Sequence, residues 1–168
     1  MHHASPLSPS APPRGRIGLA RLAQTAVRGL DALAPLVDLA VRLFVAGVFF
    51  KSGLTKIASW STTVLLFENE YAVPFLPPEV AALLGTGVEL VFPVLLVLGL
   101  GTRFAAFVLF VFNIIAVLSY PDLGAVGLKD HQTWGLLLLV TLTHGPGALS
   151  LDALIGRRFF GTPSPARP

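Results

Sequence analysis

The sequence contains no cysteine among its 168 residues, and only 12% of those residues are charged. The lack of cysteine excludes disulfide bridges, thiolate metal sites and Cys-x-x-Cys redox centres. The low charge sets the chain apart from soluble domains, in which about a quarter of the residues are charged. By contrast, 54% of the residues are hydrophobic and the mean hydropathy is +0.75. This composition predicts a protein that is solvated largely by lipid.

The apolar residues gather in four blocks, near residues 36–58, 80–100, 103–119 and 133–150. Each block is close to the roughly 20 residues that cross a hydrocarbon core as a helix. A soluble four-helix bundle is the alternative, but it requires polar stripes that residues 104–118 lack. We therefore expect an all-α fold, a polytopic membrane four-helix bundle with an N-terminal amphipathic helix.

The basic residues predict how the chain is oriented in the membrane. A net charge of +3 and a pI near 9.8 would also suit nucleic-acid binding. However, the arginines cluster at the ends of the apolar blocks, so the expected partner is the lipid bilayer and not nucleic acid. The flanking arginines are Arg14, Arg16, Arg21, Arg28, Arg103, Arg157, Arg158 and Arg167. By the positive-inside rule both termini are expected to be cytoplasmic.

The chain outside the four blocks is expected to form two tails and an interfacial helix. Residues 1–16 and 160–168 are rich in proline and predict disordered tails. Residues 17–34 place polar and apolar side chains on opposite helix faces, which predicts an amphipathic helix on the inner leaflet. We expect Pro35 to end that helix. The bundle itself is expected to span residues 36–159.

Two further segments predict local structure at the ends of the spans. The loop at about 59–78 is too apolar to be free and contains three prolines, which predicts a short helix at 60–70 and a turn that docks on the bundle. The segment GPGALSLD should end the fourth helix, because Pro146 lacks a backbone donor. Ser150 or Asp152 could then cap a short helix that runs through Arg158.

One carboxylate interrupts the second apolar block, in the stretch GVELVFPVLLVLGLGTR. An ionised group at such depth costs several kcal/mol, so Glu89 needs a basic partner or a proton. Ala81 and Gly85 precede Glu89 at intervals of four, so it continues a face of small residues that another helix can approach. Two states are open for Glu89: a basic side chain pairs with it, or it is protonated and bonded to a neighbour such as Asn113.

The first block supplies the candidate basic partners. Arg42 and Lys56 lie within about 60° of one another on a helix face that also carries small residues. We expect Arg42 to hold Glu89, with Lys56 or His131 closing the outer side of the same pocket. Snorkelling to the two interfaces is the alternative for both basic residues. The expected polar pocket comprises Arg42, Lys56, Glu89, Asn113 and His131.

No intrinsic cofactor or metal is expected. His131 and His144 are thirteen residues apart on one helix, about 20 Å, so they cannot ligate one haem or metal ion together. Asn113 stands in the middle of the third span, where a structural hydrogen bond to a facing helix is the alternative to a functional role.

Several short patterns occur in a recognisable order. They are Arg42-x4-Gly47-x5-Gly53-x2-Lys56, then YAVPFLPP, Glu89 followed by LLVLGLGTR, HQTWG and GPGALSLDALIGRR. Together they resemble the DoxX family of small bacterial four-helix membrane proteins, over residues 36–159. The recurrent polar positions of that family fall on Arg42, Lys56, Glu89 and His131.

The resemblance implies a protein of the bacterial inner membrane that works in quinone-coupled oxidation or anchors a soluble redox enzyme. We expect a redox-associated, quinone-linked membrane subunit whose only cofactor is a bound quinone. Its expected partner is a soluble redox enzyme or another membrane subunit, and catalysis by the chain itself stays open. Two alternatives remain: an assembly subunit without catalysis, and a small-solute or ion pathway, which four short spans could form only as an oligomer.

Overall fold

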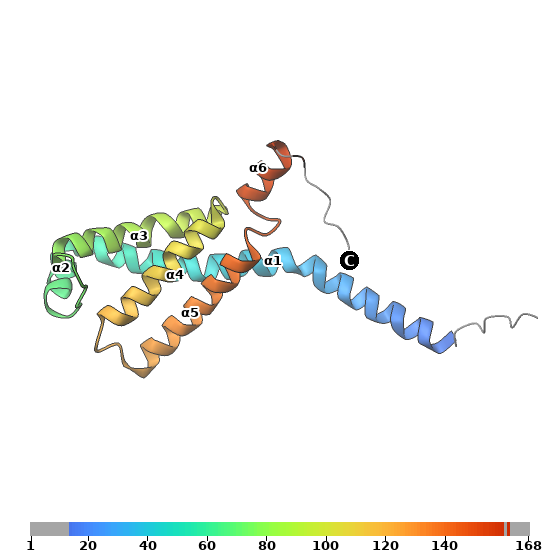
Figure 1. Ribbon diagram of the computed structural model, residues 1–168, viewed down its shortest axis with the longest axis horizontal. Coiled ribbons are helices and arrows are strands. Elements are labelled where there is room, and N and C mark those ends of the chain that lie inside the picture. Colours follow the sequence, from blue (N-terminus) through green and yellow to red (C-terminus); the bar gives the residue numbers. More distant parts are fainter. Residues whose placement is uncertain (1–13, 160, 162–168) are drawn as a thin grey trace, which may run out of the picture. The chain divides into compact units, whose positions relative to one another are not determined.

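The computed structural model describes residues 14–159 and residue 161, and Figure 1 shows their helices. In chain order these are α1 (Arg14–Ala58), α2 (Trp60–Asn69), α3 (Pro78–Leu98), α4 (Thr102–Ser119), α5 (Gly124–His144) and α6 (Leu151–Phe159). The described residues contain no strand, so the all-α prediction is confirmed. The predicted tails lie outside the described residues apart from residue 161 and residues 14–16, which are helical and belong to α1.

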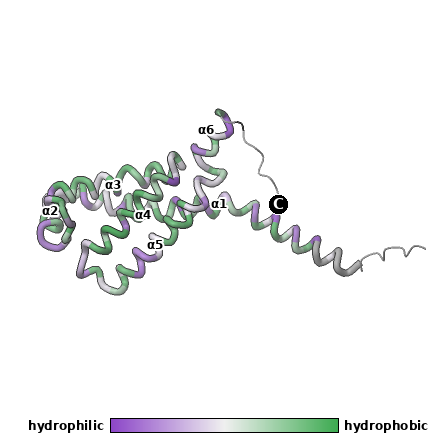
Figure 2. The backbone as a smooth tube through the Cα atoms, in the orientation of Figure 1, coloured by the Kyte–Doolittle hydropathy of each residue, from purple (hydrophilic) through white to green (hydrophobic). Residues whose placement is uncertain are grey.

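Within the described residues, three helices are long and apolar enough to cross a membrane, and the chain is a polytopic membrane protein. They are residues Arg21–Ala58 of α1, Pro78–Leu98 and Thr102–Ser119. Figure 2 shows that hydrophobic residues dominate α3 and α4. α5 has 21 residues but is not among the three, because polar residues of the KDHQT stretch occupy its first half. The fourth predicted span therefore stays a prediction.

α1 continues through Pro35, so the predicted break at this proline is wrong. A proline inside a helix removes one backbone hydrogen bond, but membrane helices tolerate that loss when the freed groups find other partners. The described residues nevertheless divide into two compact units at this point, one up to Ala34 and one from Pro35 onward. In the first unit Leu22 and Leu30 are exposed, and the Thr25 hydroxyl donates to the Arg21 carbonyl.

In the second unit α3 packs against α4 and α4 against α5, and the second part of α1 shares their buried core (Figure 1). Ala105 and Ala106 are fully buried, and such small side chains allow neighbouring helices to approach closely. Phe49 of α1 lies edge-on to Phe112 of α4 and to Trp134 of α5, with ring centroids 6.3 and 6.1 Å apart. These aromatic contacts join α1 to the other helices.

The predicted short helix in the first loop is confirmed as α2. Phe67 of α2 is buried against Ala81 and Ala82 of α3. After α2 the chain turns back on the bundle, as expected, because the Ala72 amide donates to the Ser119 carbonyl at the end of α4 (2.8 Å). Tyr71 also lies edge-on to Tyr120, with ring centroids 5.1 Å apart.

The opposite end of the bundle is fixed by the GPGALSLD segment. α5 ends at His144, as predicted, and Ser150 caps α6 by accepting a hydrogen bond from the Ala153 amide (3.1 Å). Asp152 does not cap its own helix. Instead it accepts hydrogen bonds from the Gly101 and Thr102 amides, both at 2.8 Å, and so caps the N-terminus of α4. We call this the α6 end of the bundle, and the opposite one the α2 end.

Candidate functional site

A cavity of about 670 Å³ lies at the α2 end of the bundle, between α1, α2, α3, α4 and α5. Its wall is mostly apolar and aromatic, with residues such as Phe49, Val88, Phe112 and Trp134. Leu84 lines the same cavity and is 54% exposed, so the cavity reaches the surface of the bundle. The polar side chains on its wall are Lys51, Ser52, Thr55, Lys56, Tyr71, Glu89, Ser119, Tyr120 and His131.

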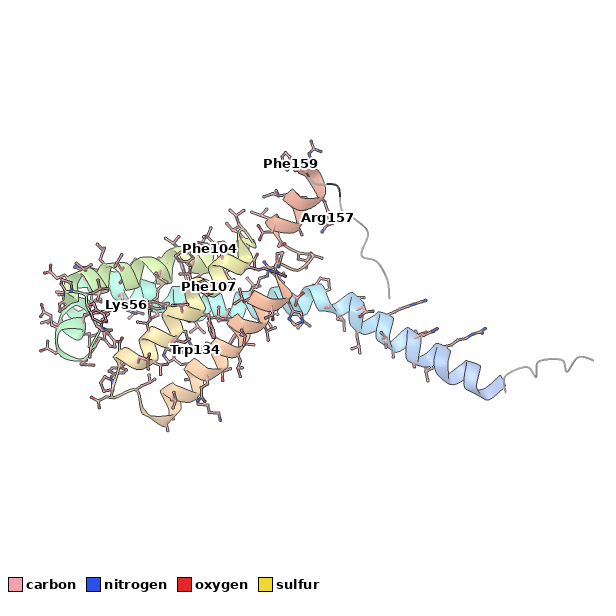
Figure 3. All side chains as sticks on the ribbon, in the orientation of Figure 1. Lys56, Phe104, Phe107, Trp134, Arg157 and Phe159 are labelled. Atoms are coloured by element: carbon pink, nitrogen blue, oxygen red, sulfur yellow. The ribbon has the colours of Figure 1, made fainter. Side chains whose placement is uncertain are left out.

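The central polar feature of the cavity is an ion pair between α1 and α3. The Lys56 Nζ donates to both carboxylate oxygens of Glu89, at 2.8 and 2.7 Å, and to the Ser52 hydroxyl at 2.9 Å. Both side chains are largely removed from solvent, with 17% of Lys56 and 6% of Glu89 exposed. Figure 3 labels Lys56 at its place in the bundle. Of the two states predicted for Glu89, the structure shows the one in which a basic side chain pairs with it.

Gly53 makes this pairing possible, because it lies one turn before Lys56 on the same face of α1. A Cβ atom at Gly53 would stand only 3.1 Å from the Cβ of Glu89 and 2.8 Å from a methyl carbon of Leu90. Any larger residue would require the Leu90 side chain to move or the two helices to separate slightly. The small-residue face predicted on α1 therefore serves the contact between the two charged residues.

The expected pair between Arg42 and Glu89 is wrong. Arg42 is buried, 1% exposed, but its guanidinium donates to the Leu96 carbonyl at 3.3 Å and to the Leu149 carbonyl. Leu96 follows Glu89 by seven residues, which is about 10 Å along α3. Arg42 therefore meets α3 two turns away from the carboxylate, at the α6 end, and does not line the cavity.

Asn113 of α4 bonds His131 of α5 and not Glu89, so the alternative of a Glu89–Asn113 hydrogen bond is not realised. The Asn113 Nδ2 donates to the His131 carbonyl at 2.9 Å, and its Oδ1 lies 2.8 Å from the His131 Nδ1. The His131 carbonyl can only accept a hydrogen bond, so the NH₂ group of the Asn113 amide must face it. The Asn113 Oδ1 must then accept from the Nδ1–H, so a neutral His131 keeps its lone pair on Nε2.

The structure thus divides the five predicted site residues into three groups. Lys56, Glu89 and His131 line one cavity, Asn113 holds His131 in place, and Arg42 lies elsewhere. Among the described residues, no three His, Asp or Glu side chains gather as a metal site would require.

Sequence reasoning missed two polar groups of the cavity, Ser119 in the last turn of α4 and Tyr71 in the loop after α2. Ser119 is 3% exposed and its hydroxyl has no hydrogen-bond partner, which is uncommon for a buried polar group. The pKa of Tyr71 is raised, mainly by burial and further by the nearby Tyr120, Glu70 and Glu89. Its phenol therefore stays protonated. The only sequence signal for Tyr71 was the apolar, proline-rich loop that contains it.

Comparisons with known proteins find a family model and a relative that this chain resembles. A family model described as DoxX matches residues 37–121, about half of the chain, from α1 to the loop after α4. An uncharacterized protein of Haemophilus influenzae is 35% identical over 126 residues, which cover 70% of this chain and 82% of that protein. No solved structure matches the chain. The matched range includes Lys56, Glu89 and Asn113, whereas His131 lies beyond it.

Proposed function

This chain belongs to the DoxX family of membrane proteins, and we propose that its cavity binds the headgroup of a neutral membrane quinone. In this proposal the protein is a quinone-linked membrane subunit that works with a soluble redox enzyme or with another membrane subunit. The observation that carries the proposal is the combination of an apolar, aromatic wall with a few polar groups in one cavity that reaches the surface.

The size and lining of the cavity suit a lipid-soluble ring. Small-molecule sites are typically 300–1,000 Å³ and mostly apolar, with a few polar groups that orient the ligand. The cavity volume of about 670 Å³ lies within this range. Because Leu84 on its wall is also exposed at the surface of a membrane-spanning helix, a ligand dissolved in lipid could enter from the side.

The charge of the cavity favours a neutral ligand over an ion. Lys56 has three N–H donors, and all three find acceptors, two on Glu89 and one on Ser52. The ion pair therefore neutralises itself, and the remaining charged side chain on the wall is Lys51, which is exposed on the other side of α1. Because the centre of the cavity carries no net charge, it suits a quinone or quinol better than a small ion.

Other groups remain available to the oxygen atoms of a quinone ring. The Ser119 hydroxyl has no partner, and the Tyr71 phenol is protonated, so both can donate to a quinone carbonyl. The Nε2 of neutral His131 can accept a hydrogen bond from a quinol hydroxyl, and it could take one of the two protons that a quinol loses on oxidation, the other passing to solvent or the partner. The chain has no cysteine, so the electrons would pass to a redox centre on the partner.

We also propose that the protein resides in the bacterial inner membrane with four spans and both termini cytoplasmic. α5 would be the fourth span, with its polar first half shielded by α4 through the Asn113–His131 bonds. The arginines near the α6 end, Arg103, Arg157 and Arg158, would then lie on the cytoplasmic side.

Tryptophan fluorescence can test the ligand proposal directly, because Trp134 lines the cavity and Trp60 does not. In a Trp60→Phe protein in nanodiscs, a short-chain quinone should quench Trp134 in a saturable way. Ser119→Ala and His131→Phe should each weaken the apparent affinity by about 2–12-fold, the usual range for one hydrogen bond. Asp152→Asn, at the other end of the bundle, is the matched control and should leave the affinity unchanged.

An isoprenoid alcohol without the quinone ring separates headgroup binding from simple partition into the cavity. The quinone proposal fails if this alcohol competes with the quinone at the cavity with an affinity equal to that of the quinone itself. It also fails if quenching of Trp134 rises linearly with quinone concentration in every variant, without saturation. Co-purification of a soluble enzyme in the absence of any saturable quenching would favour the anchor alternative instead.

A further inference from the structure

α6 has two different faces, although it is only nine residues long. On the side that carries Asp152, Ala153 and Gly156 the helix is partly buried. On the other side the large apolar residues are exposed, with Leu154 at 61% and Phe159 at 75%. Leu151 and Ile155 extend this apolar face at helical spacing. A surface of this kind is unfavourable in water and has no protein cover in the described residues.

The polar contacts of α6 place this apolar face at the edge of the lipid. Asp152 bonds the amides of Gly101 and Thr102, where the membrane-spanning α4 begins, and its own amide donates to the Gly99 carbonyl at 2.9 Å. The N-terminus of α6 is thus fixed at the level where α3 ends and α4 starts. That level corresponds to the membrane interface, because α3 and α4 are just long enough to cross the hydrocarbon core.

Arginines accompany the apolar face at the same level. Arg157 and Arg158 form the last turn of α6, and Arg103 lies in the first turn of α4. Arg157 and Arg103 each donate one hydrogen bond from Nη2, to the Ala148 and Thr143 carbonyls respectively. All three side chains are exposed and keep further N–H donors for other acceptors. Figure 3 shows Arg157 and Phe159 together on α6.

We propose that α6 is a binding site for anionic phospholipid of the surrounding bilayer. Its apolar face lies among the acyl chains, and Arg157, Arg158 and Arg103 bind the phosphate groups of neighbouring lipids. Interfacial helices combine an apolar face with arginines in this way, and guanidinium groups bind phosphate with two parallel hydrogen bonds. The proposal does not depend on quinone binding, because α6 and the cavity lie at opposite ends of the bundle.

Hydrogen exchange on the full-length protein in nanodiscs tests this site. Amides of residues 151–159 should exchange more slowly when the nanodiscs contain phosphatidylglycerol than when they contain only phosphatidylcholine. Since an arginine near an anionic surface contributes about a fivefold change in binding, Arg157→Gln with Arg158→Gln should abolish most of the difference. Molar salt should weaken it as well, because salt screens exposed charges.

Two control variants separate lipid binding from a general loss of structure. Arg158→Lys keeps the charge and should retain most of the protection by phosphatidylglycerol. Lys129→Gln removes one exposed positive charge from the first half of α5, towards the α2 end, and should change nothing at α6. Equal protection in both lipids, or a phosphatidylglycerol effect that Lys129→Gln removes and the double variant Arg157→Gln with Arg158→Gln does not, would overturn the proposal.

Discussion

The ion pair between Lys56 and Glu89 gives the sharpest prediction about stability. Lys56→Met or Glu89→Gln alone leaves the remaining partner in an apolar cavity without its counter-charge or its bidentate contact. Removing one member of a buried pair typically costs about 3–5 kcal/mol. We expect the lower end, about 3 kcal/mol, because 17% of Lys56 is exposed and Ser52 remains as an acceptor.

The double variant should be more stable than the sum of the two losses predicts, since neither charge then remains unpaired. Thermal unfolding in one detergent measures all four proteins. For a chain of this size, 3 kcal/mol corresponds to a fall in Tm of roughly 6–12 °C. Additive losses for Lys56→Met and Glu89→Gln would show that the two residues do not interact and would refute the geometry of the cavity.

Arg42 supplies the matched control for this double-mutant cycle. Arg42→Met should also destabilise the protein, because it removes the donor to the Leu149 carbonyl and one of the two donors to the Leu96 carbonyl, which keeps the Gly99 amide. Combined with Glu89→Gln, however, its loss should be additive, since the two residues lie about two helical turns apart along α3. If the losses of stability were non-additive for Arg42 with Glu89 and additive for Lys56 with Glu89, the pairing expected from the sequence would be correct after all.

Two further predictions concern the α6 end and the topology. Burial raises the pKa of Asp152, but hydrogen bonds from the Thr102 and Gly101 backbone outweigh burial and hold it below its ordinary value. Its stabilising effect should therefore be fully present above about pH 4 and lost as the pH falls through the lowered pKa, so wild type and Asp152→Asn should converge in acid unfolding curves. If α5 spans the membrane, reporter fusions after Arg103 and after Lys129 should report opposite sides; the same side would refute four spans.

The positions of most helices could be predicted from the sequence, because long apolar blocks and prolines directly determine where helices can form. The short α2 and the end of α5 at His144 follow from the same local signals. Pro35 is the exception. Whether a proline ends a helix depends on whether the freed carbonyl finds another partner, and a local sequence pattern does not contain that information.

The candidate site was predicted only in part. The sequence shows that Glu89 needs a partner and that two basic residues share a face of α1. It does not show how far α1 is displaced along its axis relative to α3, and this displacement decides between Lys56 and Arg42. The capping of α4 by Asp152 was missed for a similar reason. The amides that donate to its carboxylate lie some fifty residues earlier in the chain, and the sequence does not show that they are close.

The two ends of the bundle use their buried polar groups in different ways, and this difference bears on where a ligand can act. At the α6 end, Arg42 and Asp152 bond backbone groups at helix ends, so neither can move without disturbing the helices themselves. At the α2 end, Lys56 and Glu89 bond each other through side chains beside a cavity of about 670 Å³. Contacts between side chains can rearrange by rotamer changes that leave the backbone in place. Structural adjustment to a bound molecule should therefore be concentrated at the α2 end, while the α6 end stays fixed against the lipid.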